Sequence, residues 1–164
     1  DVLIRAFAAA RGTANLSHVL ALVGGRGWMY ASLFELVREL GLQEHVRFAG
    51  YVDPAHLPLW YNAADLFAYP SAYEGFGLPV LEAMACGIPT VTSSSGALQE
   101  LAGDACLTVE PGSVESLQLA IVKVLEDPDL VERLRTASLA RAAGFSWMKA
   151  AAATAGVYER VARS

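Results

Sequence analysis

The stretch Tyr73 to Thr92, which reads YEGFGLPVLEAMACGIPTVT, constrains the fold more than any other part of this chain. It follows the apolar run Asp65 to Pro70 and ends in a second one, Pro89 to Thr92, and both runs are typical of buried strands. The residues between them predict a helix over Leu78 to Cys86, which Gly87 is placed to end. The order of strand, glycine-rich turn, helix and strand predicts a right-handed parallel crossover within one sheet.

The glycine-rich turn, Glu74 to Leu78, follows the carboxyl end of the first of these strands. Gly75 and Gly77 indicate a backbone that bends sharply or approaches another group closely, and Pro79 suits a first helical turn. Open α/β sheets bind ligands at this edge, and the free N–H groups of a helix amino terminus favour phosphate. The turn therefore predicts a site for a phosphate or diphosphate.

Two carboxylates, Glu74 and Glu82, flank this predicted site with seven residues between them. Neither should touch a phosphate, because like charges at short range repel each other. A carboxylate accepts hydrogen bonds from neighbouring hydroxyls, so the pair suits a sugar on one side of a diphosphate and a ribose on the other. Either residue alone is better explained as a solvated acid. Both together, within this glycine and proline frame, predict a nucleotide-sugar site.

The segment EGFGLPVLEAMACGIPTVTS resembles family 4 of the retaining glycosyltransferases with the GT-B fold, the glycosyltransferase group 1 proteins. Glu74 and Glu82 fit the E-x7-E pattern of that family. The resemblance implies that Glu74 contacts the transferred sugar as the catalytic carboxylate and that Glu82 binds the ribose hydroxyls. It also implies that main-chain amides hold the sugar and phosphate, and by position these belong to Gly75, Phe76, Gly77, Leu78 and Val80.

Two further loops are expected at the same edge. His18 to Val23 predicts a strand buried on both faces, and the glycine loop Gly24 to Gly27 follows it. In the resembled family this loop borders the base and ribose, so Arg26 is either a nucleotide contact or a solvated loop charge, with equal weight. The family resemblance also assigns backbone contacts with the base to Tyr51 and Val52.

The remaining pattern predicts one α/β domain over residues 1–164, with helices only from residue 113 onward. We expect a doubly wound, Rossmann-like, mostly parallel sheet with helices on both faces, which the resemblance makes one half of a GT-B fold. Outside the central crossover, the predicted strands are His18 to Val23, Val46 to Ala49 and Asp104 to Glu110. The other predicted helices are Val2 to Arg11, Trp28 to Leu40, Pro54 to Ala64, Leu98 to Ala102, Ser113 to Glu126, one from Pro128, and Trp147 to about Arg163.

Composition excludes several classes of partner. The net charge of −5 makes the surface repel nucleic acid, so no nucleic acid partner is expected. The two cysteines and three histidines lack metal-ligand spacing, so we expect core thiols, no metal and no cofactor besides the donor substrate. No apolar run reaches the roughly 18 residues of a membrane span. We expect a cytoplasmic protein, or one that is peripheral to a membrane at full length.

The chain starts at Asp1, and the resemblance implies that an N-terminal acceptor domain and the first strand of this domain are absent. In a sheet of order 3-2-1-4-5-6, that strand would lie between His18 to Val23 and Asp65 to Tyr69. Unpaired backbone in a buried sheet is costly, so direct pairing, a segment of another chain or association should close the gap. We expect this fragment alone to be poorly stable or oligomeric, to bind nucleotide sugars weakly and to transfer no sugar.

Two other functions compete with sugar transfer. One is a nucleotide-binding or regulatory module that has kept the site without transfer activity. The other is an epimerase or phosphorylase on the same GT-B scaffold. A phosphorylase needs a lysine for pyridoxal phosphate, and the only lysines are Lys123 and Lys149, both in the predicted C-terminal helices. The phosphorylase hypothesis is therefore weak.

Overall fold

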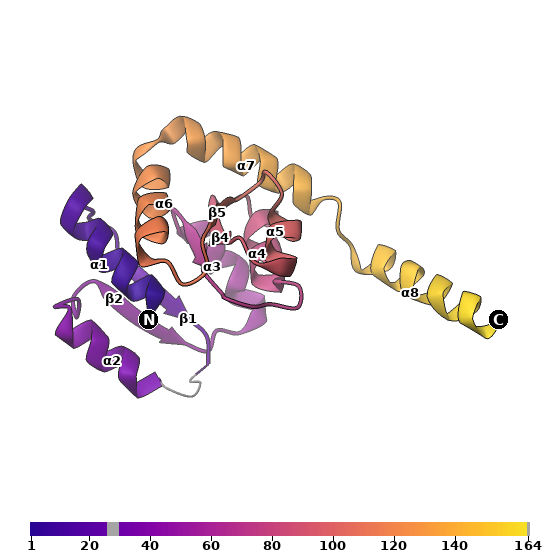
Figure 1. Cartoon of the computed structure of the whole chain (residues 1–164), viewed down its shortest axis with the longest axis horizontal. Coiled ribbons are helices and arrows are strands. Elements are labelled where there is room, and N and C mark those ends of the chain that lie inside the picture. Colours follow the sequence, from indigo (N-terminus) through magenta and orange to yellow (C-terminus); the bar gives the residue numbers. More distant parts are fainter. Residues whose placement is uncertain (26–29, 164) are drawn as a thin grey trace.

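The computed structural model describes residues 1–25 and 30–163 of the chain, in which strands and helices alternate until the helical C-terminal part (Figure 1). The strands are β1 (Leu20–Val23), β2 (Val46–Gly50), β3 (Phe67–Tyr69), β4 (Thr90–Ser93) and β5 (Leu107–Val109). The helices are α1 (Val2–Ala14), α2 (Tyr30–Glu39), the 3-10 helix η1 (Pro54–His56), α3 (Leu57–Ala63), α4 (Leu78–Ala85), α5 (Gly96–Ala102), α6 (Val114–Glu126), α7 (Pro128–Ala142) and α8 (Trp147–Ala162).

The predicted central crossover is confirmed. β3 and β4 are parallel, with Phe67 opposite Thr90, and α4 connects them. α4 begins at Leu78 with a proline in its first turn, and the chain leaves it through Gly87 at a φ of 69°. β5 extends the same sheet in parallel, so the strand order is β3-β4-β5. The turn that carries Glu74 therefore lies at the carboxyl end of β3.

β1 and β2 form a separate parallel pair, with Leu20 opposite Val46. Within the described residues β1 pairs with β2 alone and β3 with β4 alone, so direct pairing of β1 with β3 does not occur. Direct pairing was one of three expected ways to close the sheet, and it is wrong.

The expectation that His18 to Val23 is buried on both faces is also wrong. Side chains alternate along β1, and Val19 and Val23 are 52% and 42% exposed. α1 covers one face, where Ile4 and Phe7 pack with the half-buried Leu20. An apolar run shows that its side chains favour burial. Burial of both faces of the strand also needs a helix or another element to cover each face. Among the described residues, no element buries the second face.

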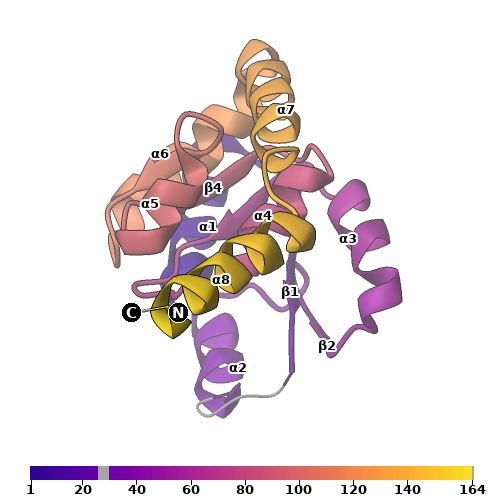
Figure 2. The ribbon, with the colours of Figure 1, turned by 90° about the vertical axis from the view of Figure 1, so that its right-hand side faces the viewer.

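The three-stranded sheet has apolar clusters on both faces, which confirms the predicted α/β layering. On one face, Val91 of β4 packs with α6 and α1. On the other, Phe67 and Tyr69 of β3 pack with α4 and α5 around Val80 and Met84. In Figure 2, α3 lies to the right of this sheet, and α5 and α6 lie to its left. Phe67 and Tyr69, which are two residues apart on β3, thus lie on the same face of the sheet, as strand alternation requires.

Most helix starts are where the sequence predicts them. Side chains accept a hydrogen bond from a backbone N–H of the first turn at four helix starts, and these cap residues are Asp53, Ser113, Asp127 and Ser146. The end of α1 differs, because the helix continues through Ala14 in place of the predicted connection from Gly12 to Ser17. Thr13 donates its hydroxyl to the carbonyls of the preceding turn, and Asn15 ends the helix at a φ of 46°.

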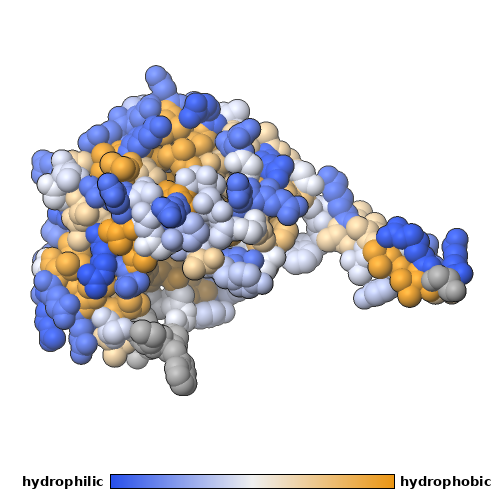
Figure 3. All heavy atoms as spheres, viewed as in Figure 1, coloured by the Kyte–Doolittle hydropathy of each residue, from blue (hydrophilic) through white to orange (hydrophobic). Residues whose placement is uncertain are grey.

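α8 stands apart from the body of the protein (Figure 1) and buries none of its residues. Trp147, Met148 and Tyr158 are each more than 70% exposed, and the space-filling view shows hydrophobic residues on α8 beside charged ones (Figure 3). No described helix is both long enough and apolar enough to cross a membrane.

Candidate functional site

The loop between β3 and α4 is fastened to the end of β4 by hydroxyl groups. Thr92 Oγ1 donates to the carbonyl oxygen of Tyr69 at 3.0 Å. Ser93 Oγ donates to the carbonyl of Ser71, and Ser95 Oγ lies 3.4 Å from the same oxygen. The serine segment after β4, predicted at the ligand edge, thus lies directly against the loop that leads to Glu74. These contacts fix where the loop leaves the sheet.

Gly77 is the position in this loop where only glycine fits. Its φ is 94°, in the left-handed region that side chains rarely adopt, and the residue is buried. A Cβ added there would lie 2.5 Å from Leu98 Cδ2, inside the core between α4 and α5. The absence of a side chain therefore lets the loop pass close to α5 immediately before α4 begins.

The amide groups of Gly75, Phe76, Gly77 and Leu78 find no acceptor among the described residues. They stand at the amino terminus of α4, where the helix dipole favours an anion. Val80 differs, because its N–H donates to the Gly77 carbonyl at 3.0 Å and its side chain is fully buried. The ligand contact expected through the Val80 amide stays a prediction, and in this structure the first helical turn already uses that group.

Glu74 is held by the last residue of β3. The hydroxyl of Tyr69 donates to Glu74 Oε1 at 2.7 Å, and both residues are half-buried. Burial, together with the hydrogen bond to the Glu74 carboxylate, raises the pKa of Tyr69 to about 12. Tyr69 is thus a lasting hydrogen-bond donor to this carboxylate at neutral pH.

Glu82 has a matching partner on a different helix. The hydroxyl of Tyr61, in α3, donates to Glu82 Oε2 at 2.9 Å. Burial and this hydrogen bond raise the pKa of Tyr61 well above its usual value. Burial and the charge of Glu82 also raise the pKa of Cys86, the residue after α4. A carboxylate on one turn of α4 thus faces both a tyrosine and a thiol.

One aromatic row connects the two carboxylates, as far as the described contacts show. The ring of Phe67 packs edge-on against Tyr61 at 5.3 Å and is stacked with Tyr69 at 6.0 Å. Tyr61 and Tyr69 are the ends of this row, and each donates to one glutamate. That Glu74 and Glu82 both point into one cleft, on the same side as Gly24 to Gly27, stays a prediction. Sequence patterns had not singled out either tyrosine.

Raising the pH should reveal the Tyr69 pair in a protein without ligand. Because the pKa of Tyr69 is about 12 in the fold and 10.0 otherwise, the folded state holds an extra proton between these values. The stabilisation is complete below pH 10 and is lost as the pH rises through 12. When tyrosine ionisation is followed by absorbance, Tyr69→Phe should show one fewer tyrosine that ionises near pH 12 than wild type does. In Glu74→Gln that group should titrate earlier; an unchanged curve in both variants would contradict the pairing.

The loops expected at the nucleotide side lie together after β1 and β2. The Gly24 N–H donates to the Gly50 carbonyl at 2.9 Å, which places the glycine loop beside the segment that continues into Tyr51 and Val52. Tyr51 is 76% exposed and Val52 is half-buried. Arg26 lies outside the described residues. The described contacts do not connect these loops to Glu74 or Glu82.

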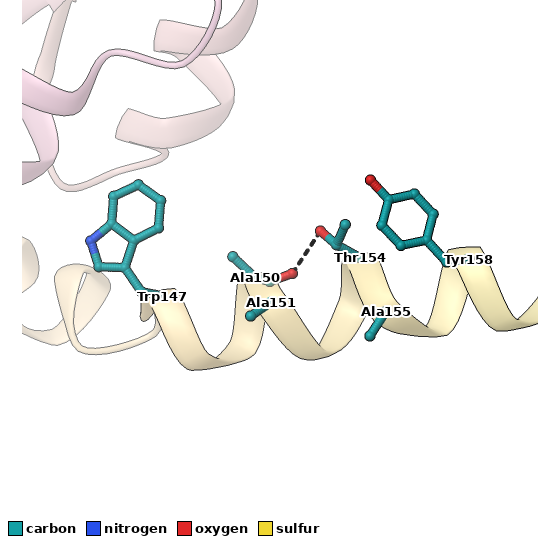
Figure 4. Close-up of a pocket in the computed structure, with 6 residues that line it drawn as sticks. All are labelled: Trp147, Ala150, Ala151, Thr154, Ala155 and Tyr158. Carbon is teal, nitrogen blue, oxygen red and sulfur yellow. Dashed lines mark hydrogen bonds between the residues drawn. The ribbon is translucent and has the colours of Figure 1, made fainter.

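Two hollows formed by described residues lie away from the two glutamates. A shallow hollow of about 420 Å³ follows one face of α8, between Trp147 and Tyr158, where Thr154 donates to the Ala150 carbonyl at 2.9 Å (Figure 4). Another, of about 560 Å³, lies between α1 and α2. Neither of these hollows is lined by Glu74 or Glu82. The described part of the chain contains no group of three side chains that could hold a metal ion.

Comparison with known proteins gives a consistent family. The sequence profile of the family described as glycosyl transferases group 1 matches residues 1–141. The O-antigen chain mannosyltransferase B of Escherichia coli is 40% identical over 145 residues, which cover 88% of this chain and 38% of that protein.

Solved structures agree with the sequence matches. The sucrose-phosphate synthase from Thermosynechococcus elongatus superposes with a TM-score of 0.84 at 32% identity, covering 98% of this chain and 43% of that one. The Anabaena protein HepE, in complex with UDP-glucose, superposes with a TM-score of 0.79 at 29% identity, covering 87% of this chain and 40% of that one. The chain thus spans about two fifths of the length of these relatives.

Proposed function

Because this chain belongs to the glycosyl transferases group 1 family, we propose that it is the donor-binding domain of an enzyme that transfers a sugar from a nucleoside diphosphate sugar to an acceptor hydroxyl. The observation that supports this most is the arrangement of Glu74 and Glu82. Each accepts a hydrogen bond from one end of the same aromatic row, beside the free amides that precede α4. The complex of HepE with UDP-glucose, a structural relative, supports the same class of donor.

The chemistry of the site follows from its charges. The unused N–H groups of Gly75 to Leu78, with the α4 dipole behind them, would stabilise the negative charge that develops on the leaving diphosphate. Glu74 would accept a hydrogen bond from a hydroxyl of the transferred sugar, and this bond tightens as the sugar becomes positively charged. We propose a retaining reaction, as in family 4 of these enzymes, and nuclear magnetic resonance of the product anomer tests this.

The nucleotide would extend away from Glu74 along the domain. Glu82 is proposed to accept hydrogen bonds from the ribose hydroxyls, since its carboxylate is exposed and only one oxygen is engaged by Tyr61. Tyr51 and Val52 are proposed to contact the base through their backbone, with Arg26 beside the nucleotide. An acceptor domain, supplied by the rest of the protein, completes the active site in this proposal. No metal is needed for transfer, so a chelator should leave activity unchanged.

Calorimetry of the full-length protein with UDP, GDP, ADP and their glucose or mannose derivatives tests this function directly. We expect one nucleoside diphosphate and its sugar to bind, and transfer to be measurable with that donor. Binding without any transfer would favour the regulatory module over the enzyme. Interconversion of the donor sugar without an acceptor would favour an epimerase. Absence of binding to every nucleotide would overturn the proposal.

Replacing Glu82 by alanine should chiefly weaken binding of the nucleotide. The loss of hydrogen bonds to a charged group is expected to cost about 1.5 to 3 kcal/mol, or roughly 10- to 150-fold in affinity. Calorimetry with the nucleoside diphosphate alone measures this, because the transferred sugar is then absent. Glu132→Ala, which removes an exposed carboxylate of α7, is the matched control. Equal affinity of the Glu82 variant and this control would contradict the assignment.

A further inference from the structure

Among the tyrosines whose side chains the structure describes, Tyr61 and Tyr69 share one arrangement. Each is half-buried and donates its hydroxyl to one of the two glutamates, at 2.9 Å to Glu82 and 2.7 Å to Glu74. The first bond joins α3 to α4, and the second joins the end of β3 to the loop after it. In each pair a residue on a regular element holds a carboxylate that the sequence pattern had placed in the site.

The hydrogen bonds leave each carboxylate with a free side. An ionised carboxylate has two oxygens and about four acceptor positions. Tyr61 contacts only Oε2 of Glu82, and Tyr69 contacts only Oε1 of Glu74. The other oxygen in each case is unused by the described residues and can accept a ligand hydroxyl. A glutamate held at one oxygen also loses less rotamer freedom when a ligand binds, so more of the ligand contact appears as affinity.

The tyrosines themselves are positioned by Phe67. Its ring contacts Tyr61 at 5.3 Å and Tyr69 at 6.0 Å, and it packs on the core around Val80 and Met84. The spacing between the two hydroxyls is thus determined by packed aromatic rings and not by flexible loops. A side chain locked by packing positions its partner better than an exposed one does.

We propose that Tyr61 and Tyr69 are positioning residues with separate tasks, Tyr61 orienting Glu82 toward the ribose and Tyr69 orienting Glu74 toward the transferred sugar. This inference rests on the proposed function. Tyr61 acts in a contact that is made equally before and during transfer, so its loss weakens donor binding. Tyr69 acts in a contact that strengthens in the transition state, so its loss lowers turnover.

Tyr61→Phe and Tyr69→Phe keep the ring packing and remove only the hydroxyl. In the full-length enzyme, Tyr61→Phe should weaken binding of the nucleoside diphosphate roughly 3- to 10-fold, with kcat unchanged. Tyr69→Phe should leave that affinity unchanged and lower kcat by roughly tenfold. Tyr158→Phe, on the exposed surface of α8, is the matched control and should change neither constant. Thermal unfolding of all three variants verifies that they fold.

A second measurement separates positioning from general damage to the site. With a 2′,3′-dideoxy form of the same nucleoside diphosphate, which lacks the hydroxyls assigned to Glu82, wild type and Tyr61→Phe should bind equally. In the variant Glu82→Gln, adding Tyr61→Phe should weaken nucleotide binding little further, because the two residues act through one contact.

Several outcomes would overturn this inference. One is an equal loss of affinity of Tyr61→Phe for the ribose and dideoxy nucleotides. Another is that the effects of Tyr61→Phe and Glu82→Gln add. A third is that the same constant, affinity or kcat, changes in both tyrosine variants. Unchanged constants in both variants would also overturn it while leaving the proposed function intact, since wild type would still bind and transfer. A wild type that binds no nucleotide would instead overturn the proposed function, and the inference with it.

Discussion

Replacing Glu74 by alanine should lower turnover by roughly 100- to 1,000-fold, the usual effect of removing one preorganised contact with a developing charge. Donor affinity should change much less, because the contact of Glu74 with the sugar tightens only in the transition state. The distance of 2.7 Å to Tyr69 shows a carboxylate that is already oriented before a ligand arrives. Steady-state kinetics with saturating donor measures kcat, and calorimetry measures affinity.

Two companion variants make this result specific. Glu132→Ala removes an exposed carboxylate from α7 and should retain full turnover. Glu82→Ala should show the opposite pattern, with weaker nucleotide binding and a smaller change in kcat. If Glu74→Ala and Glu82→Ala lower both constants to the same extent, the separate roles of the two glutamates are wrong.

Replacing Gly77 by alanine should destabilise the domain by about 2 to 5 kcal/mol. A left-handed backbone costs a residue with a side chain about 1 to 2 kcal/mol, and overpacking costs about 1 to 3 kcal/mol. Both apply here, because φ is 94° and the added Cβ would lie 2.5 Å from Leu98 Cδ2. Leu98 is fully buried, so its side chain can shift only against the neighbours that it packs with. Denaturant unfolding of the variant and wild type measures the difference.

Gly112→Ala is the control for this prediction. Gly112 has a φ of 77° and no atom within 4 Å of an added Cβ, so only the backbone term applies. The difference between the two variants isolates the contact with Leu98. A loss of stability at Gly77 no larger than that at Gly112 would show that the loop moves away from α5 at little cost.

The sequence predicted those features that depend on neighbouring residues. The crossover from β3 through α4 to β4 follows from two apolar runs on either side of a glycine, proline and glycine frame. Helix caps such as Asp127 and Ser146 were predictable because a cap bonds within three residues of itself. Local chemistry of this kind is visible in the order of the residues alone.

Features that depend on distant partners were not predictable. Tyr61 meets Glu82 from a position 21 residues away, on another helix, and no spacing rule connects them. Tyr69 was nearer to prediction, since it shares a strand face with Phe67 and lies just before the loop of Glu74. The exposure of β1 depends on which elements cover it. The engaged amide of Val80 depends on how tightly the first turn of α4 closes.

α1, a helix rich in alanine, packs against both sheets of the domain. Ile4 and Phe7 on one side of the helix pack against β1 and β2, whereas Ala6 and Ala10 on another side pack into the cluster of α6 and β4. Within the described residues the two sheets share no strand pairing, whereas α1 packs against both of them. A displacement of α1 would therefore act on both sheets at once, and through them on the loops after β1 and β3.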